Sequence, residues 1–122
     1  ESPMFDSPTE ILPHEHVLLV AIHSSRLDEA TMRKLAVDVL AAASKRPGVP
    51  IVLDVSRVRF APSSSLGLLV QLARGLKFEG RRLVLINVEP RLLATIQVTC
   101  LDSVVEIHDN VDQVVSSPPK KP

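Results

Sequence analysis

Three consecutive serines, Ser63, Ser64 and Ser65, open an apolar segment with helical periodicity and are the residues of this chain best placed to do chemistry. The first turn of a helix leaves backbone N–H groups unpaired, and the helix dipole favours a negative charge there. A serine at this position is a favourable N-cap, worth about 1 kcal/mol, and also tolerates a phosphate. The serine run therefore allows two interpretations, a structural cap and a phosphorylation site.

A carboxylate, Asp54, ends the apolar run that precedes the serines. In open α/β sheets, functional residues gather at the C-terminal ends of strands, which makes Asp54 a candidate binding residue. A strand-end aspartate also commonly caps the turn that follows it. The residues alone favour this second, structural interpretation.

Patterns typical of enzymes and metal sites are missing from the sequence. It contains no nucleophile elbow, no Walker loop and no dinucleotide-binding fingerprint, so we predict no catalytic residue and no cofactor. His14 and His16 alternate on one face of a predicted strand, but a metal site needs three or four ligands. We therefore expect two surface histidines and no metal site.

The composition indicates a small globular domain. Apolar residues make up 45% of the 122 residues, and 14 basic side chains balance 14 acidic ones. A neutral chain with 2% aromatic residues lacks the basic patches and stacking surfaces that nucleic acids require. The single cysteine, Cys100, cannot form an intrachain disulfide and is expected to be buried as a small apolar residue. No apolar run approaches the ~20 residues of a membrane span, so we predict a cytoplasmic protein that does not insert into membranes.

Periodicity predicts one α/β domain over residues 9–115, with a flexible leader at 1–8 and a disordered tail at 116–122. Strands are predicted at 10–14, 17–23, 50–55, 82–87 and 104–107. Helices are predicted at 28–45 and 63–79, from Pro90 onward, and from Asp109 or Asn110 to Val115. Alternation after an initial hairpin implies a mixed sheet of four to five strands with helices packed against it.

Two features around the serines predict how this segment packs. Val58 and Phe60 alternate with two arginines, which indicates an extended link with one side facing inward. Gly67 and Gly75, inside the second helix, are expected to let that helix pack closely against a neighbour.

With these elements in place, the sequence resembles the STAS domain, the fold of bacterial anti-sigma-factor antagonists. The family's pattern is a strand ending in D-L-S, a short link, and D-S-S-G-L-G opening a helix. The chain has Asp54-Val55-Ser56 and then Pro62-Ser63-Ser64-Ser65-Leu66-Gly67, and Leu27-Asp28 matches the family's L-D pair at the first helix. The resemblance extends over residues 11–115 in element order and implies a STAS-like fold.

The resemblance also implies a protein that binds partners and has no catalytic activity. Antagonists of the family bind a serine kinase that otherwise holds a sigma factor. Phosphorylation of the serine after the motif aspartate breaks the complex, and a phosphatase restores it. That serine aligns with Ser63. The implied partner surface is the helix start and the preceding link: Asp54, Arg57, Arg59, Pro62, Ser63, Ser64, Ser65 and Leu66.

Two departures from the family pattern leave alternatives open. Pro62 replaces the motif aspartate, and Ser65 replaces the motif glycine, so Ser64 or Ser65 is an alternative acceptor for the phosphate. The departures also favour a second function within the fold, a non-phosphorylated scaffold or an accessory subunit of a lipid transporter, in which the serines are only caps. Homo-oligomerisation is open in either case. A third class, an enzyme or small-ligand binder, requires a pocket with convergent polar groups.

Overall fold

Five strands form one sheet in the order β1-β2-β3-β4-β5 in the computed structural model, which describes residues 9–99 and 104–116. They are β1 (Thr9–Leu12), β2 (Leu18–Ile22), β3 (Ile51–Asp54), β4 (Leu83–Ile86) and β5 (Glu106–His108). β1 pairs antiparallel with β2, and the other strands pair in parallel. The predicted mixed sheet is confirmed, although the ends of the strands shift by one or two residues.

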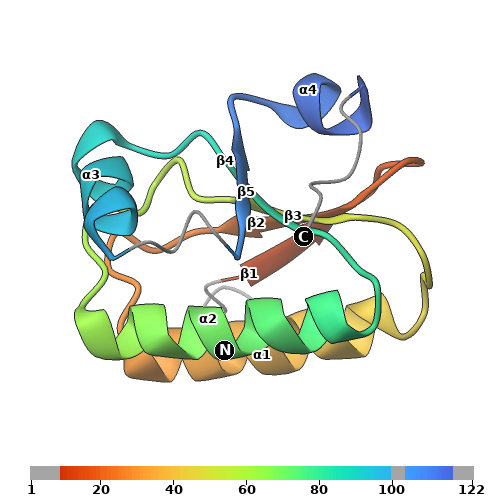
Figure 1. Cartoon of the computed structure of the whole chain (residues 1–122). Coiled ribbons are helices and arrows are strands. Elements are labelled where there is room, and N and C mark those ends of the chain that lie inside the picture. The colour runs from red at the N-terminus through yellow and green to blue at the C-terminus, as the bar shows by residue number, and fades with distance from the viewer. Residues whose placement is uncertain (1–8, 100–103, 117–122) are drawn as a thin grey trace, which may run out of the picture.

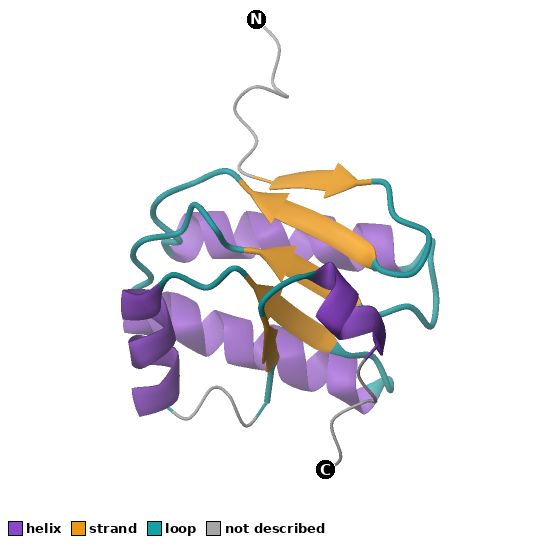
Figure 2. Ribbon diagram, turned by 90° about the horizontal axis from the view of Figure 1, so that it is seen from above, coloured by secondary structure: helices purple, strands orange, loops and turns teal. Residues whose placement is uncertain are grey.

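The helices in the described part of the chain are α1 (Glu29–Ala43), α2 (Ser63–Phe78), α3 (Pro90–Val98) and α4 (Val111–Ser116). α1 and α2 lie side by side on one face of the sheet, and α4 lies on the other (Figure 1). Figure 2 shows α3 at the end of the sheet where α2 begins. The element order therefore follows the predicted alternation. In the described residues, no helix is long and apolar enough to cross a bilayer.

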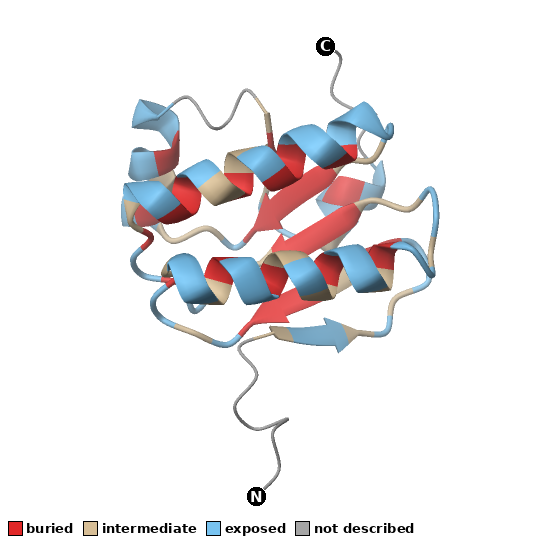
Figure 3. Cartoon of the chain, turned by 90° about the horizontal axis from the view of Figure 1, so that it is seen from below, coloured by how far each residue is buried: buried red, intermediate tan, exposed pale blue. Residues whose placement is uncertain are grey.

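The main core lies between the sheet and the layer formed by α1 and α2. Each helix turns one buried stripe toward the sheet and exposes its opposite side (Figure 3). The second face of the sheet carries a smaller core, in which α4 covers the strands: Val114 packs with Val17, Val52, Val84 and Ile86. Because both faces are covered, β3 and β4 are apolar at successive positions.

Local signals set the ends of the helices. Asp28 is the N-cap of α1, where its Oδ1 accepts a hydrogen bond of 2.9 Å from the Thr31 N–H. Asn110 caps α4 in the same way, accepting 3.0 Å from the Gln113 N–H. Gly80, with φ of 78°, takes the left-handed conformation just after α2. These caps agree with the sequence-based prediction.

Three expectations differ from the structure. β1 ends at Leu12, so His14 and His16 lie in the connection to β2 and not on a strand. Ser116, assigned to the tail by composition, is the last residue of α4. Gly67 and Gly75 are exposed. Among the described residues, no atom outside the adjoining backbone of α2 lies within 4 Å of where a side chain would begin, so the predicted close helix packing is wrong. Helical periodicity gives the buried stripe, but a glycine outside that stripe faces solvent.

Candidate functional site

The start of α2 lies at the carboxyl edge of the parallel strands, near the start of α1 (Figure 2). Backbone hydrogen bonds fix the link before α2 against the segment before α1. The N–H groups of Arg59 and Phe60 donate to the Ser25 carbonyl at 2.8 and 3.2 Å, and the Leu27 N–H donates to the Phe60 carbonyl at 2.8 Å. The two sequence stretches that resemble the STAS motifs are therefore brought together in space.

Pro62, and not Ser63, occupies the N-cap position of α2. Its φ of −66° and ψ of 160° place it just outside the helix, and its carbonyl accepts from the N–H groups of Ser65 and Leu66 at 3.0 and 3.1 Å. Because proline has no side-chain acceptor, the N-cap residue of this helix makes no side-chain capping hydrogen bond. The interpretation of Ser63 as the N-cap is thus wrong, since the chain enters the helix one residue earlier.

The three serines occupy different environments. Ser63 and Ser64 are exposed in the first turn of α2. Ser65 is 0% exposed, and its Oγ has no hydrogen-bond partner in the described structure. A modifying enzyme can therefore reach the hydroxyls of Ser63 and Ser64, whereas that of Ser65 faces the interior. Leu66, assigned to the partner surface by resemblance, is also buried, at 4% exposure.

Asp54 organises the ends of β3 and β4. Its Oδ1 accepts a hydrogen bond of 3.0 Å from the Ser56 N–H and a longer one of 3.4 Å from the Asn87 side chain. Asn87, the residue after β4, has φ of 57°, a left-handed conformation that asparagine tolerates better than most residues. This arrangement agrees with the interpretation of Asp54 as the cap of the following turn. The role of Asn87 was not predicted from the sequence, which placed it inside a strand.

The link before the serines exposes cationic side chains and one aromatic ring. Arg57 and Arg59 are exposed, and the Arg26 guanidinium lies 4.8 Å from the centroid of the Phe60 ring. Of the two apolar residues in the link, Val58 is fully buried but Phe60 is 49% exposed, so the predicted inward face holds for only one of them. The link that leads to Ser63 therefore exposes two arginines and an aromatic ring, which suits a protein partner better than a small substrate.

A cavity of about 10 Å³ lies beneath the start of α2 and is lined only by apolar side chains, among them Leu27, Leu66 and Leu92. It is too small for a ligand and presents no polar group. No group of three His, Cys, Asp or Glu residues able to hold a metal ion occurs within residues 9–99 and 104–116. Cys100 lies outside the described residues.

A family model described as "Mlab, STAS domain" matches residues 15–107. Among solved structures, an anti-sigma-factor antagonist (STAS) domain protein from Planctomyces limnophilus is 23% identical, with 88% of this chain and 93% of that chain covered and a TM-score of 0.73. The phosphorylated form of the Bacillus cell fate determinant SpoIIAA is 17% identical, with coverages of 87% and 96% and a TM-score of 0.63. The murine anion transporter Slc26a9 is 18% identical over 82% of this chain and 17% of that chain, with a TM-score of 0.70. At these identities the likeness shows the fold.

Proposed function

Because the chain belongs to the STAS domain family, whose model matches residues 15–107, we propose that it is an anti-sigma-factor antagonist switched by phosphorylation at Ser63. In this proposal the unphosphorylated protein binds a serine kinase that also acts as an anti-sigma factor, in the cytoplasm, and a phosphatase reverses the modification. The observation that carries the proposal is the exposed Ser63 hydroxyl at the uncapped start of a 16-residue helix.

The electrostatics of the helix start support a switch of this kind. A phosphate adds a charge of about −1.5 to −2, which the unpaired N–H groups and the helix dipole tolerate in the free protein. In a packed interface the same group is bulky and costly to desolvate. Phosphorylation at Ser63 would therefore leave the fold intact and remove the complex.

Pro62 stands where the family has an aspartate, so a kinase that phosphorylates Ser63 must itself provide the carboxylate that assists the hydroxyl. The family's aspartate is absent at this position, and Asp54 is hydrogen-bonded to Ser56 and Asn87 at the end of β3. No carboxylate from the motif position then assists the Ser63 hydroxyl. The basic surface of Arg57 and Arg59, together with the exposed Phe60 ring, would give the partner its main contacts.

A second candidate function has its own support. The matching family model is named for Mlab, and the STAS fold also occurs in the anion transporter Slc26a9. In this alternative the protein is a non-phosphorylated scaffold or a transporter accessory subunit. Ser63 and Ser64 would then serve only to begin α2, and the same basic surface would contact a subunit of the assembly.

A pull-down from lysate of the source organism, with ADP and magnesium present, separates the two functions. Wild type is compared with Ser63→Asp, Ser63→Ala and the matched control Ser64→Asp, which places the same charge on the neighbouring exposed residue. Recovery of a serine kinase with wild type and Ser63→Ala, lost with Ser63→Asp, supports the antagonist. Equal loss with Ser64→Asp would mean that charge at either position is sufficient. Recovery of a transporter or scaffold assembly that is indifferent to every variant would support the second function.

A further inference from the structure

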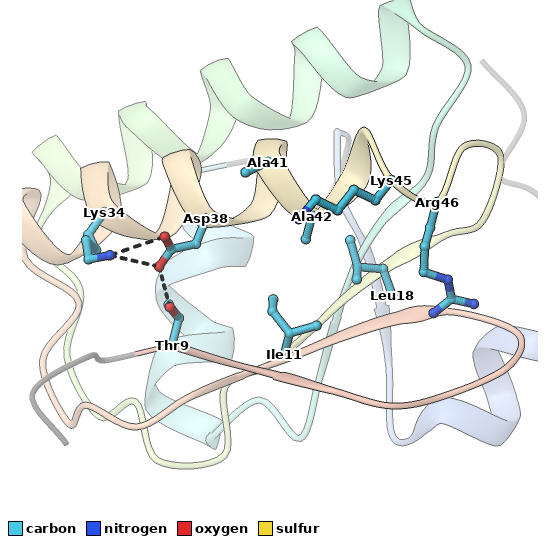
Figure 4. Close-up of a pocket in the computed structure, with 9 residues that line it drawn as sticks. All are labelled: Thr9, Ile11, Leu18, Lys34, Asp38, Ala41, Ala42, Lys45 and Arg46. Atoms are coloured by element: carbon cyan, nitrogen blue, oxygen red, sulfur yellow. Dashed lines mark hydrogen bonds and ion pairs between the residues drawn. The ribbon is translucent and has the colours of Figure 1, made fainter. Parts of the chain in front are cut away.

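A groove between β1 and α1 lies apart from the serines and has a volume of about 500 Å³. Figure 4 shows its residues: Thr9 and Ile11 from β1, Leu18 from β2, and Ala41 and Ala42 from α1 form its walls. The two alanines leave the space open because their side chains are short. Ile11, at 44% exposure, is the largest apolar side chain presented to solvent along the groove.

The charged groups on the rim of the groove are mostly cationic. The rim carries one carboxylate, Asp38, and three cationic side chains: Lys34, Lys45 and Arg46. Lys34 is paired with Asp38 at 3.2 Å, and the Arg46 guanidinium donates to the carbonyls of Val17 and Glu15. Lys45 is exposed, and although its backbone N–H donates to the Ala42 carbonyl, its ammonium group makes no hydrogen bond or ion pair with any described residue. One free ammonium group therefore stands at the end of an apolar groove.

Among the described residues, β1 is the outermost strand of the sheet and is paired with β2 on one side. Every second residue of such a strand directs its N–H and C=O groups to the open side, where another strand can pair with them. Thr9 and Ile11 turn their side chains toward α1 and line the groove. The side chain of Glu10 lies on the opposite face of the sheet, where its Oε1 is 2.7 Å from the Nε2 of His23. A strand added to this edge would send alternate side chains into the groove.

From these observations we infer that the β1 edge and its groove form a docking site for an extended acidic segment of a partner protein. The segment adds a sixth strand beside β1, an apolar side chain packs between Ile11 and the alanines of α1, and a carboxylate pairs with Lys45. Charge complementarity favours an acidic segment over a second copy of the chain. In a dimer formed through two grooves, both rims would carry an excess of positive charge and would repel each other. The open shape favours a strand over a small ligand, which would remain largely in water.

The site is separate from the Ser63 surface. The cationic end of the groove lies at the amino end of β2, where Arg46 binds the Val17 carbonyl, whereas α2 begins at the carboxyl end of the parallel strands. Two partners can therefore be bound at once, one along the β1 edge and one at the start of α2. Phosphorylation at Ser63 leaves this second surface unchanged.

Phage-displayed random dodecapeptides selected on the immobilised full chain test this inference. We expect enriched peptides in which apolar residues alternate with Asp or Glu. Synthetic copies of these peptides are then titrated, by fluorescence anisotropy, against wild type, Lys45→Glu, Ile11→Lys and the control Val37→Lys. Val37 is 65% exposed on α1 and lies outside the groove residues, so it reports nonspecific charge effects. Lys45→Glu and Ile11→Lys should each weaken binding by about tenfold or more, and Val37→Lys should not.

Each outcome decides the inference. Amide hydrogen exchange that slows in β1 on peptide binding would confirm strand addition, provided that circular dichroism shows both groove variants to be folded. Enrichment of basic peptides, binding that is insensitive to Lys45→Glu, or no enrichment would overturn it. Protection confined to α1 would mean that the occupant is not a strand. Dimerisation of the free chain that Ile11→Lys abolishes would assign the groove to a second copy instead.

Discussion

Ser63 and Ser65 lie two positions apart in the first turn of α2, yet one hydroxyl is exposed to solvent and the other is fully buried. With 3.6 residues per helical turn, residues two apart point to nearly opposite sides of a helix. The serine run is thus not one functional unit. Ser63 and Ser64 are exposed to solvent, whereas Ser65 lies against the core. Each serine can therefore be tested by its own substitution.

Replacing Ser65 with alanine should stabilise the protein. The Ser65 Oγ is buried without a hydrogen-bond partner, and such a group costs free energy that alanine does not. Alanine also has the higher helix propensity. We expect Ser65→Ala to raise the free energy of unfolding by about 1 kcal/mol in urea titrations. Ser64→Ala, on the exposed side, should change it by less than about 0.5 kcal/mol. A loss of stability in Ser65→Ala would show that the hydroxyl has a partner.

Ser63 should contribute little to stability, in contrast to the true N-cap of α1. Asp28 accepts a hydrogen bond from the Thr31 N–H, which also lowers the pKa of the Asp28 carboxyl. We expect Asp28→Ala to lower the free energy of unfolding clearly and Ser63→Ala to change it by less than about 0.5 kcal/mol. Thermal unfolding of the two variants, measured side by side, checks this. Equal losses would mean that Ser63 does cap α2 in solution.

Gly75 offers a stabilising substitution. It lies on the exposed side of α2, away from the ends of the helix, and no described atom outside the adjoining helix backbone is within 4 Å of the position of an added Cβ. Alanine there removes backbone freedom from the unfolded chain without a clash, so Gly75→Ala should add about 1 kcal/mol to the free energy of unfolding. A decrease, read from the same urea titration, would reveal a close neighbour on this side of α2, such as a second chain.

Much of the fold could be predicted from local patterns. The continuous apolar runs at 51–53 and Leu83–Ile86 indicated buried parallel strands, and Asp28 indicated the start of α1. These signals depend only on neighbours in the sequence. The alternation of strands and helices then limited the topology to a mixed sheet with crossover helices.

The site was harder to predict because it depends on contacts between distant segments. Ser65 is buried because of the way α2 is rotated about its axis against the core. Sequence periodicity predicts that rotation only to within about one residue, so it could not separate Ser65 from its neighbours. The exposed Phe60 ring has its cation partner, Arg26, in a distant segment, the one before α1. Both Pro62 and Ser63 are acceptable at a helix start, so the sequence could not say which of them is the N-cap.

Arg81 joins three chain segments, and its loss should be costly. Its guanidinium donates to the carbonyls of Ala43, Arg46 and Val49 at 2.8 to 2.9 Å, which satisfies the C-terminal end of α1 and the loop that follows. We expect Arg81→Met to lower the free energy of unfolding by about 3 kcal/mol, because partly buried carbonyls lose charged donors. Arg74→Met, at an exposed position of α2, is the control. A small effect in both variants would mean that water replaces the guanidinium.

Glu106 should make stability depend on pH in the acid range. Burial raises the pKa of its carboxyl. The hydrogen bonds from Arg82 and His108 together lower this pKa by a larger amount, so the pKa of Glu106 lies below its usual value. A carboxyl with a lowered pKa in the folded state stabilises the protein above its unfolded pKa of about 4.3. This contribution is lost as the pH falls through the folded pKa. Stability should therefore decline below about pH 4.5.

Glu106→Gln isolates this contribution. The variant removes the charge of the carboxylate that Arg82 holds at 2.6 and 2.8 Å, and should be about 3 kcal/mol less stable at neutral pH. Urea midpoints of the variant should fall less steeply than those of wild type in the acid range, since the titrating group is gone. Glu29→Gln removes an exposed ion pair with Arg33 and should retain the wild-type slope. Parallel curves for wild type and Glu106→Gln would place the acid sensitivity on other carboxyls.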